Sequence, residues 1–299
     1  MMIGRLIRQF FLKPIEMPKA KEIDVSKMKT IGIILGPYRN LTTLTAGILS
    51  LHPNCQILNH AGIRLLPWKK LNIFNNLSEN ELEKFKQYAV YMSGGGKRGD
   101  WGGSITFSHA FTHKKMSELY RDRFGDNLIK KEINSLVWKE SLRIANYIKN
   151  KKINMKELLE RTSELRFILP VRNPLDCALS NIKTGKTKLF GDLNDSTSLK
   201  QTITVILEEF RWFLDLRANS PEKFYYYFQH SFNEKMLNEL CDFLQLKRDK
   251  KWVENSMDVF DMKSSYKFDS DIIEFYKKEI NRLFNEKPFF KENLIRFVN

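Results

Sequence analysis

Two stretches of the chain combine residue types that bind anions. The first is "GPYRNLTTLTAG", in which Arg39, Thr42 and Thr43 follow a short apolar run. The second is "RNPLDCALS", in which Ser180 follows Arg172 by eight residues. A guanidinium binds phosphate-like groups through a planar fork of N–H donors, and a hydroxyl adds another donor. Each stretch therefore predicts a site for one anionic group.

Both stretches lie where a predicted strand meets a predicted helix. Residues 31–35 and 165–171 are apolar runs typical of buried strands. Helices are expected over 42–51 and from Pro174 to about Thr184, with Asn173 as N-cap and Gly185 as the stop. The N-terminus of a helix favours an anion through its free N–H groups and its dipole. On neighbouring parallel strands, the two corners would hold one ligand with two anionic groups.

The glycine-containing motifs of common nucleotide-binding proteins are not matched. A nucleoside triphosphatase needs GxxxxGK[ST], whose lysine and hydroxyl serve the phosphates and magnesium. The first corner lacks this ending, which favours an anion bound without a metal. Gly94, Gly96 and Gly99 match GxGxxG, but Asp-Trp-Gly-Gly follows in place of a helix, so the dinucleotide hypothesis is rejected. The segment 93–113 is then a loop over a site or a plain surface loop.

The remaining pattern predicts an α/β protein. Strands are expected over 56–58 and 224–228, and a capping box at residues 78–81 opens a helix toward Tyr91. Further helices are expected over 114–123, 141–149, 198–218 and 270–285, and in the segment that ends with "CDFLQL". Strands that alternate with helices predict a three-layer α/β/α fold with a mostly parallel sheet. No repeat, linker or domain boundary is visible.

Taken together, the two corners resemble motifs of the sulfotransferase family. "YRNLTTLTAGILSLHP" is similar to the family's 5′-phosphosulfate loop, roughly [KR]-S-G-T-T-L, a helix and His-Pro, and "RNPLDCALS" is similar to its 3′-phosphate motif. The resemblance covers mainly residues 31–62 and 137–181. It implies a P-loop NTPase-like sulfotransferase fold in a single domain over 1–299, with 1–28 as an N-terminal extension. It also implies 3′-phosphoadenosine 5′-phosphosulfate (PAPS) as the sulfuryl donor, without a metal.

The resemblance also implies roles for the residues of both corners. The 3′-phosphate would be bound by Arg172 and Ser180, and the 5′-phosphosulfate by Arg39, Asn40, Leu41, Thr42 and Thr43. The sequence departs from the family at two of these positions, because Leu41 stands in place of glycine and Asn40 in place of serine. The family's Arg-Lys-Gly segment is not recognisable, which leaves Lys186 and Lys263 as candidates for a third phosphate contact.

Sulfuryl transfer to a hydroxyl or amine also needs a base for the acceptor's proton. His60 stands where many family members carry a glutamate, and imidazole has a reference pKa near 6.5 that suits a general base. Glu140, beside Lys139 in "VWKESL", is the rival base, and Lys139 would contact the bridging oxygen. His109 and His113 are further alternatives.

Composition leaves other partners open. A formal net charge of +15 favours an anionic partner, so a nucleic-acid-binding protein and a kinase-like phosphate-loop protein stay as alternatives to a sulfotransferase. No basic-aromatic recognition module appears, so no nucleic-acid partner is expected. The acceptor is open among carbohydrate, lipid, peptide and small molecule, with carbohydrate slightly favoured.

The cysteines and the apolar runs bear on location. Cys55, Cys177 and Cys241 are too few and too scattered for a disulfide framework, which favours a reducing, cytoplasmic location. No apolar run reaches the roughly 20 residues that span a bilayer. Residues 1–14 are read as a frayed helix or as a basic amphipathic turn on a membrane surface.

Overall fold

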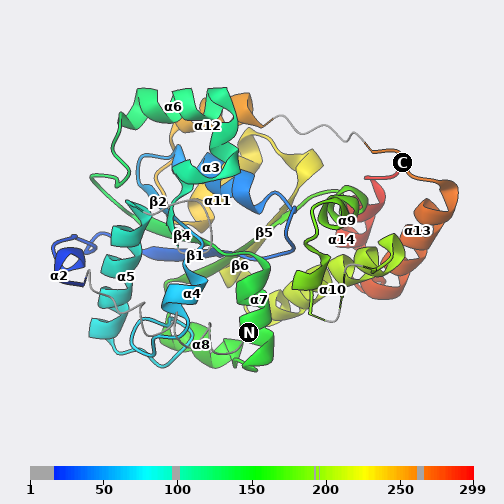
Figure 1. The fold of residues 1–299 in the computed structure, drawn as a ribbon, viewed down its shortest axis with the longest axis horizontal. Coiled ribbons are helices and arrows are strands. Elements are labelled where there is room, and N and C mark those ends of the chain that lie inside the picture. The colour runs from blue at the N-terminus through cyan, green and yellow to red at the C-terminus, as the bar shows by residue number, and fades with distance from the viewer. Residues whose placement is uncertain (1–16, 96–101, 192, 195, 261–265) are drawn as a thin grey trace.

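The protein is described from a computed structural model, in which residues 17–95, 102–191, 193–194, 196–260 and 266–299 are described. Residues 1–14, Gly96, Gly99 and Lys263, on which predictions were made above, lie outside these ranges. A six-stranded sheet runs through the middle of the molecule in the order β3-β2-β4-β1-β5-β6 (Figure 1). Its strands are β1 (Thr30–Ile34), β2 (Cys55–Asn59), β3 (Gly103–Ser104), β4 (Ser135–Lys139), β5 (Leu165–Val171) and β6 (Phe224–Phe228).

All strand pairs are parallel except the pairing of β2 with the two-residue edge strand β3. The central strands are buried on both faces, as expected for a parallel sheet. Their side chains alternate between two cores, so that Ile33 of β1 and Phe167 of β5 face one core while Ile34 and Ile168 face the other.

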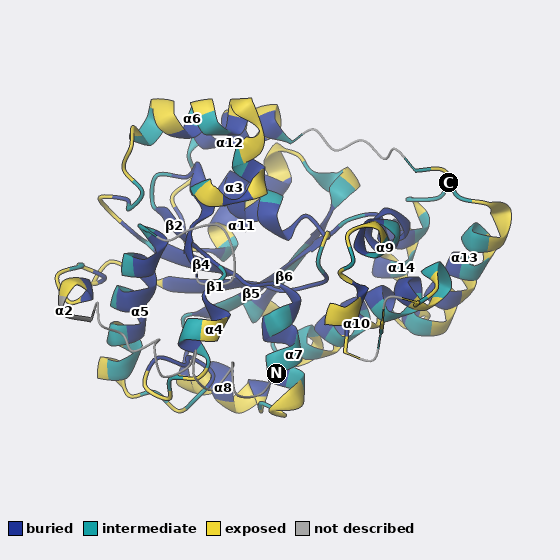
Figure 2. Cartoon of the chain, in the orientation of Figure 1, coloured by how far each residue is buried: buried dark blue, intermediate teal, exposed yellow. Residues whose placement is uncertain are grey.

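Helices cover both faces of the sheet, and their outer surfaces are exposed (Figure 2). The core on one face includes residues of α3 (Thr42–Ser50), α6 (Lys114–Phe124), α11 (Glu234–Phe243) and α12 (Lys250–Val259). The core on the other face includes residues of α2 (Met17–Ala20), α4 (Gly62–Leu65), α5 (Glu79–Ser93), α7 (Leu142–Asn150), α8 (Met155–Arg161), α9 (Pro174–Lys183), α10 (Leu199–Asn219), α13 (Ser270–Phe284) and α14 (Pro288–Ile295). The predicted three-layer α/β/α architecture is thus confirmed.

Short 3₁₀ helices lie in several connections, among them η1 (Ile105–Phe107), η2 (His109–Thr112), η3 (Thr187–Leu189), η4 (Pro221–Lys223) and η5 (Gln229–Ser231). Over the described ranges, no helix is both long and apolar enough to pass through a bilayer.

The order of the strands decides which loops meet. The strand β4, which was not predicted, lies between β1 and β2 and pairs with both, and β1 and β5 are neighbours as expected for the two corners. Because β2, β4, β1 and β5 are parallel, their carboxyl ends lie at one edge of the sheet, where ligands of open α/β sheets bind. The loops after these four strands therefore build the site.

Candidate active site

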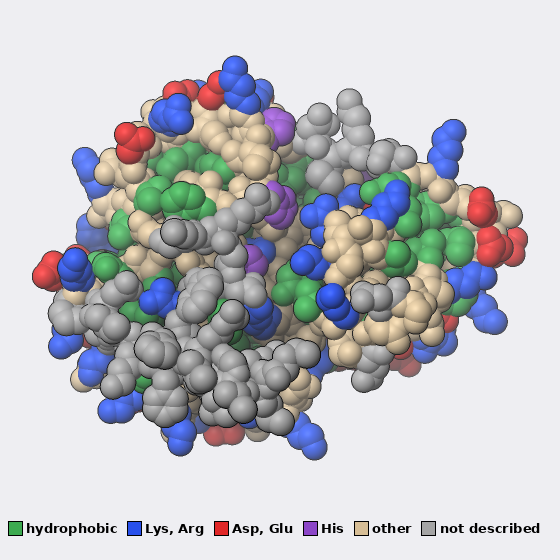
Figure 3. Space-filling model, viewed as in Figure 1, with side chains coloured by type: hydrophobic (Ala, Val, Ile, Leu, Met, Phe, Trp, Pro, Cys, Tyr) green, Lys and Arg blue, Asp and Glu red, His purple; other side chains and the backbone are tan. Residues whose placement is uncertain are grey.

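A cavity of about 700 Å³ opens at the carboxyl edge of the sheet. In the face shown in Figure 3, histidine side chains lie along a hollow that is bordered by Lys and Arg side chains. Most predicted site residues line the cavity, namely Arg39, Asn40, Leu41, Thr42, Thr43, His60, Lys139 and Arg172, together with the alternatives His109, His113 and Lys186. Ser180 and Glu140 are not among its lining residues.

The first corner joins β1 to α3. Its backbone has positive φ at Arg39 (63°) and at Leu41 (62°), in the left-handed region that glycine adopts most easily. Leu41 therefore keeps the conformation suited to the glycine that stands in the family pattern. Leu41 is the N-cap of α3 and supplies no side-chain cap, which leaves the first-turn N–H groups of this helix without a capping side chain. These donors and the helix dipole favour an anion at Thr42 and Thr43.

The hydroxyl of Thr42 is oriented by a residue that the sequence did not point to. Ser141, which follows β4, donates its Oγ–H to Thr42 Oγ1 at 2.8 Å, and both side chains are buried. Since Thr42 accepts this hydrogen bond, its own hydroxyl hydrogen is left to donate. The sequence could not give this contact, because it depends on β4 lying beside β1.

The side chain of Asn40 links the two corners through hydrogen bonds. Its side-chain Oδ1 accepts from the backbone N–H of Arg172 at 2.9 Å, and its Nδ2 donates to the carbonyl of Pro170. The residue has no exposed surface. Asn40 was predicted to contact the nucleotide, but its side-chain amide is occupied by the end of β5, so only its backbone is left for such a contact.

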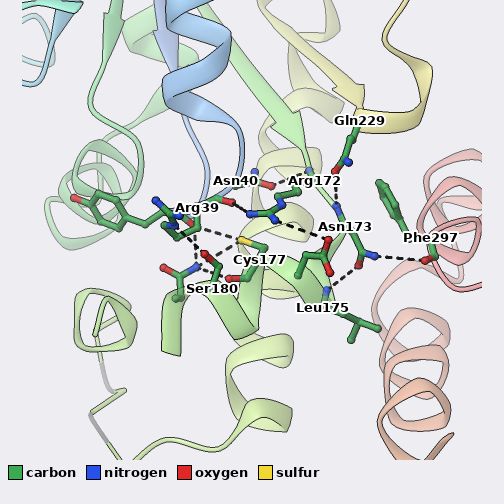
Figure 4. Close-up of polar contacts among 12 residues, drawn as sticks. Arg39, Asn40, Arg172, Asn173, Leu175, Cys177, Ser180, Gln229 and Phe297 are labelled. Carbon is green, nitrogen blue, oxygen red and sulfur yellow. Dashed lines mark hydrogen bonds and ion pairs between the residues drawn. The ribbon is translucent and has the colours of Figure 1, made fainter. Parts of the chain in front are cut away.

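The second corner joins β5 to α9 as predicted. Asn173 caps the helix by accepting from Leu175 N–H at 3.0 Å, and Pro174 is the first helical residue. Ser180 lies two turns into α9, where its Oγ accepts from Arg39 Nε at 2.9 Å (Figure 4). The guanidinium of Arg39 thus lies at the second corner, although its backbone belongs to the first.

Arg172 is partly held in place and partly unsatisfied. Its Nη1 donates to the Arg39 carbonyl at 3.2 Å, and its Nη2 lies 3.8 Å from Asp176 Oδ2 (Figure 4). Its Nε is buried and has no hydrogen-bond partner among the described residues. Arg172 and Arg39 both line the cavity, and two guanidinium groups beside a serine hydroxyl make a suitable site for a phosphate group.

His60 and Lys139 lie at the carboxyl ends of β2 and β4, next to the first corner. The side chain of His60 is 19% exposed, and its Nε2 lies 3.5 Å from Lys139 Nζ. The backbone of His60 is fixed by hydrogen bonds with Lys139 and Trp138, from His60 N–H to the Lys139 carbonyl and from Trp138 Nε1 to the His60 carbonyl. The arrangement combines a titratable nitrogen with an ammonium group at the cavity wall.

Glu140, the rival base, is placed differently. It has no exposed surface and lies behind His60, with Oε1 3.7 Å from His60 Nδ1. The carboxylate does not line the cavity, whereas its charged or titratable neighbours His60 and Arg143 do.

The walls farther from the corners come from two loops, and the first of them is the segment 93–113, which was read as a loop over a site or a plain surface loop. Ser108, His109 and His113 belong to the segment 93–113, and Lys186 and Leu189 to the segment 186–197. His109, His113 and Lys186 are exposed. Lys186 therefore stays a candidate for an additional phosphate contact.

Neither a metal cluster nor a reactive cysteine stands out. Within the described ranges, no group of three or more His, Cys, Asp and Glu side chains is arranged to hold a metal ion. Cys55, Cys177 and Cys241 are buried and free. Burial raises the pKa of Cys177 to about 12, and its Sγ donates to the Tyr38 carbonyl, so this thiol beside the second corner stays protonated and packs the turn.

Comparison with known proteins gives fold-level similarities. No protein-family model matches the chain, and no curated protein matches it in sequence. A mouse sulfotransferase, SULT7A1, solved in complex with PAP, is similar with a TM-score of 0.44 and 11% identity, covering 94% of this chain and 92% of the mouse chain. The sulfotransferase STF9 from Mycobacterium avium has a TM-score of 0.43 and 12% identity, covering 91% and 79%.

A third similar structure is the sulfotransferase domain of an olefin synthase from Synechococcus PCC 7002, with a TM-score of 0.38 and 13% identity over 83% of this chain and 93% of that domain. All three of these solved structures are sulfotransferases, the family that the two motifs resemble. Because these similarities are low, the function proposed below rests on the residues of the cavity.

Proposed function

We propose that the protein transfers a sulfuryl group from PAPS to a hydroxyl or amine acceptor. The observation that carries this proposal is the meeting of the two corners, in which Arg39 Nε bonds Ser180 Oγ at 2.9 Å and Arg172 Nη1 bonds the Arg39 carbonyl at 3.2 Å. Two anion-binding corners on neighbouring strands suit a donor that carries a phosphosulfate at one end and a separate phosphate at the other.

The residues of the second corner fit the 3′-phosphate. Arg172 lines the cavity, and Ser180 accepts from Arg39, which leaves the serine hydroxyl hydrogen to donate. Arg39, Arg172 and Ser180 would hold the phosphate together. The predicted role of Arg39 at the 5′ end is revised accordingly, because its guanidinium lies at Ser180.

The first corner would bind the 5′-phosphosulfate through the N-terminus of α3, Thr42 and Thr43. When bound, the donor supplies a sulfur electrophile whose bond to the phosphate oxygen breaks as the acceptor oxygen or nitrogen bonds to sulfur. The helix N-terminus and the threonine hydroxyls stabilise the charge that develops on the leaving phosphate. Lys139, at the end of β4, would contact the bridging oxygen and neutralise the charge that develops there.

His60 would take the acceptor's proton. It lines the cavity, it is partly exposed, and its Nε2 points toward Lys139 Nζ. General-base catalysis by a positioned histidine typically contributes about 10²–10⁴-fold to the rate. His109 and His113 line the same cavity but are exposed, so they suit contacts with the acceptor better than the reacting position.

The other hypotheses have less support. A kinase-like phosphate-loop protein would need a lysine in the first turn of the helix after β1, where this chain has Thr42, Thr43 and Leu44. A nucleic-acid-binding function is supported by the net charge alone.

Binding of adenosine 3′,5′-bisphosphate, measured by thermal shift, tests the proposal. A ligand that binds only the folded state raises the apparent stability. The bisphosphate without magnesium should raise Tm, whereas ATP with magnesium and a DNA oligomer should not. A shift with ATP–magnesium or DNA but none with the bisphosphate would refute the proposal.

Other expected properties stay proposals. A reducing, cytoplasmic compartment is supported by three buried, free cysteines, and a single domain is supported by the continuous sheet between two cores. Carbohydrate, lipid, peptide and small-molecule acceptors all stay open. Mass spectrometry of an extract supplied with labelled donor would identify the product.

A further inference from the structure

A fully buried carboxylate lies directly behind the proposed base. Glu140 has no exposed surface, yet it has three polar neighbours. The backbone N–H of Gly62 donates to its Oε2 at 2.8 Å, Arg143 Nη1 lies 2.9 Å from its Oε1, and His60 Nδ1 lies 3.7 Å from the same oxygen. Glu140 therefore joins the loop after β2 to the first turn of α7.

This environment is suited to an ionised carboxylate. Burying a lone charge is costly, but the Arg143 guanidinium and the Gly62 N–H both stabilise the negative form. The contact is close, because a Cβ added at Gly62 would lie 2.9 Å from Glu140 Cδ and 3.0 Å from Arg143 Cδ. Only glycine lets the loop approach the carboxylate in this way. The site thus holds a negative charge at a fixed position behind the imidazole.

The orientation of His60 divides the roles of its two nitrogens. Its Nδ1 faces the Glu140 carboxylate, and its Nε2 faces Lys139 Nζ and the cavity wall. Beside a carboxylate, Nδ1 is favoured to carry the proton, and beside an ammonium group, Nε2 is favoured to present its lone pair. His109 and His113 are the other histidines among the described residues that line the cavity, and they belong to its exposed wall.

We propose that Glu140 is a positioning residue that keeps the proton of neutral His60 on Nδ1 and so leaves Nε2 as the basic nitrogen toward the cavity. The consequence for catalysis rests on the proposed function, whereas the tautomer is a property of the protein alone. The acceptor's proton would move to Nε2 as its oxygen or nitrogen bonds to sulfur, and the imidazolium formed would be stabilised by Glu140. Glu140 would not itself exchange a proton with the acceptor.

The tautomer can be measured without any substrate. The protein is labelled with ¹⁵N-histidine, and long-range ¹H–¹⁵N correlation spectra distinguish a proton on Nδ1 from one on Nε2. The chain has five histidines, so the His60→Gln variant assigns the signal. We expect neutral His60 to be the Nδ1–H form in the wild type. A wild-type His60 that carries its proton on Nε2 would overturn the proposal, whether or not any variant folds.

The Glu140→Gln variant then tests the cause. A glutamine amide donates as well as accepts, so it no longer selects Nδ1–H, and the Nε2–H form should become populated. Glu209→Gln is a matched control, because Glu209 is also buried and ion-paired, with Lys149, away from the cavity. The control should leave the His60 spectrum unchanged. An unchanged tautomer in Glu140→Gln would contradict the proposed role.

Kinetics give a second readout once a sulfuryl acceptor is known. Glu140→Gln should lower kcat by about 10²–10⁴-fold, as expected when a base is left in the wrong tautomer, with the KM for the donor unchanged. An equal loss of donor binding would mean that Glu140 only supports the structure. Failure of the donor to bind the wild type would refute the sulfotransferase proposal but would leave the tautomer measurement standing.

Discussion

Arg39 Nε donates a hydrogen bond to Ser180 Oγ at 2.9 Å across a separation of 141 residues in the chain. This contact joins the two corners that are proposed to bind anions into one candidate site. It also means that the serine hydroxyl and the arginine are oriented by each other before a ligand arrives. Their contributions to ligand binding should therefore be coupled.

The first prediction concerns this coupling. Arg39→Ala and Ser180→Ala should each weaken binding of adenosine 3′,5′-bisphosphate by about 10- to 100-fold, since a hydrogen bond to a charged group contributes about 1.5–3 kcal/mol. Because the residues share one hydrogen bond, the double variant should lose less than the combined single losses. Isothermal titration calorimetry measures the bisphosphate affinity of the wild type, the two single variants and the double variant. Strict additivity would contradict a shared phosphate site.

Replacement of Arg172 tests the second corner. Arg172→Ala should abolish the thermal shift with the bisphosphate, and Arg172→Lys should restore little of it, because an ammonium lacks the planar fork of donors. Lys223→Ala serves as a control on the same sheet, since Lys223 lies before β6 and donates to the Ser163 carbonyl, away from the cavity. A normal shift in Arg172→Ala would show that this corner is misassigned.

The base assignment is tested by comparing two histidines of one cavity. His60→Gln should reduce kcat by about 10²–10⁴-fold with little change in donor affinity. His109→Gln should change mainly the KM for the acceptor, because His109 lies on the exposed wall. Steady-state kinetics with the identified acceptor check both. A larger kcat loss in His109→Gln than in His60→Gln would reverse the assignment.

Asn40 should matter for stability as well as for the site. Asn40→Ala leaves the N–H of Arg172 and the carbonyl of Pro170 without their partner in a buried place. The free energy of unfolding should fall by about 2–4 kcal/mol, the cost of two unsatisfied buried groups. Urea denaturation measures this loss. Asn146→Ala, which removes an exposed hydrogen bond to the Leu189 carbonyl, should cost far less.

A buried lysine in the connection between α6 and β4 predicts a pH dependence of stability. Lys130 is held by the Ser50 carbonyl and aromatic rings, and burial lowers the pKa of its amine to about 6. In the unfolded chain the pKa of a lysine is near 10.4. Between these values the unfolded state binds one more proton than the folded state, so the free energy of unfolding rises with pH.

The Lys130→Met variant should remove this dependence. Relative to the wild type, the variant should lose about 2 kcal/mol of its free energy of unfolding as the pH rises from roughly 6.5 to 8.5. The slope of this loss cannot exceed about 1.4 kcal/mol per pH unit. Burial also raises the pKa of Cys55, which opposes the slope at higher pH, but both proteins carry this thiol, so its contribution largely cancels in the comparison. Lys131→Met is the control, because Lys131 is the exposed neighbour of Lys130. Parallel pH profiles for Lys130→Met and the wild type would contradict a neutral folded lysine.

The sequence predicted the elements whose signals are local. Both corners and the parallel sheet were predicted from local signals, namely the apolar runs at 31–35 and 165–171 and the helix start at Asn173–Pro174. The strand β4 was missed although its last residue, Lys139, and the following Glu140 had been noted, and β3 has only two residues, which is too short for any pattern. Helices α8, α12 and α14 were also missed, since no strong periodic signal separated them from loops.

Within the site, the types of the residues were predictable, but the orientations of their side chains were not. Arg39 was expected at the first corner, and its side chain reaches the second because α9 passes beside the turn. Glu140 was a candidate base, and its burial follows from Gly62 closing over it. Ser141 carries no motif, and its contact with Thr42 exists only because β4 pairs with β1. These orientations and contacts depend on tertiary packing.

The distance along the chain from the first corner to Arg172 and Ser180 has a consequence for biosynthesis. The central strand β1 pairs with β4 and β5, which follow it by more than a hundred residues, so its hydrogen-bonded neighbours emerge from the ribosome long after it does. Contacts this distant along the chain slow folding. A nascent polypeptide that ends before α9 lacks Ser180 and so part of the proposed nucleotide site, and the nucleotide should not stabilise it. Truncated translation products should therefore be recognisable by their inability to be protected from proteolysis by adenosine 3′,5′-bisphosphate.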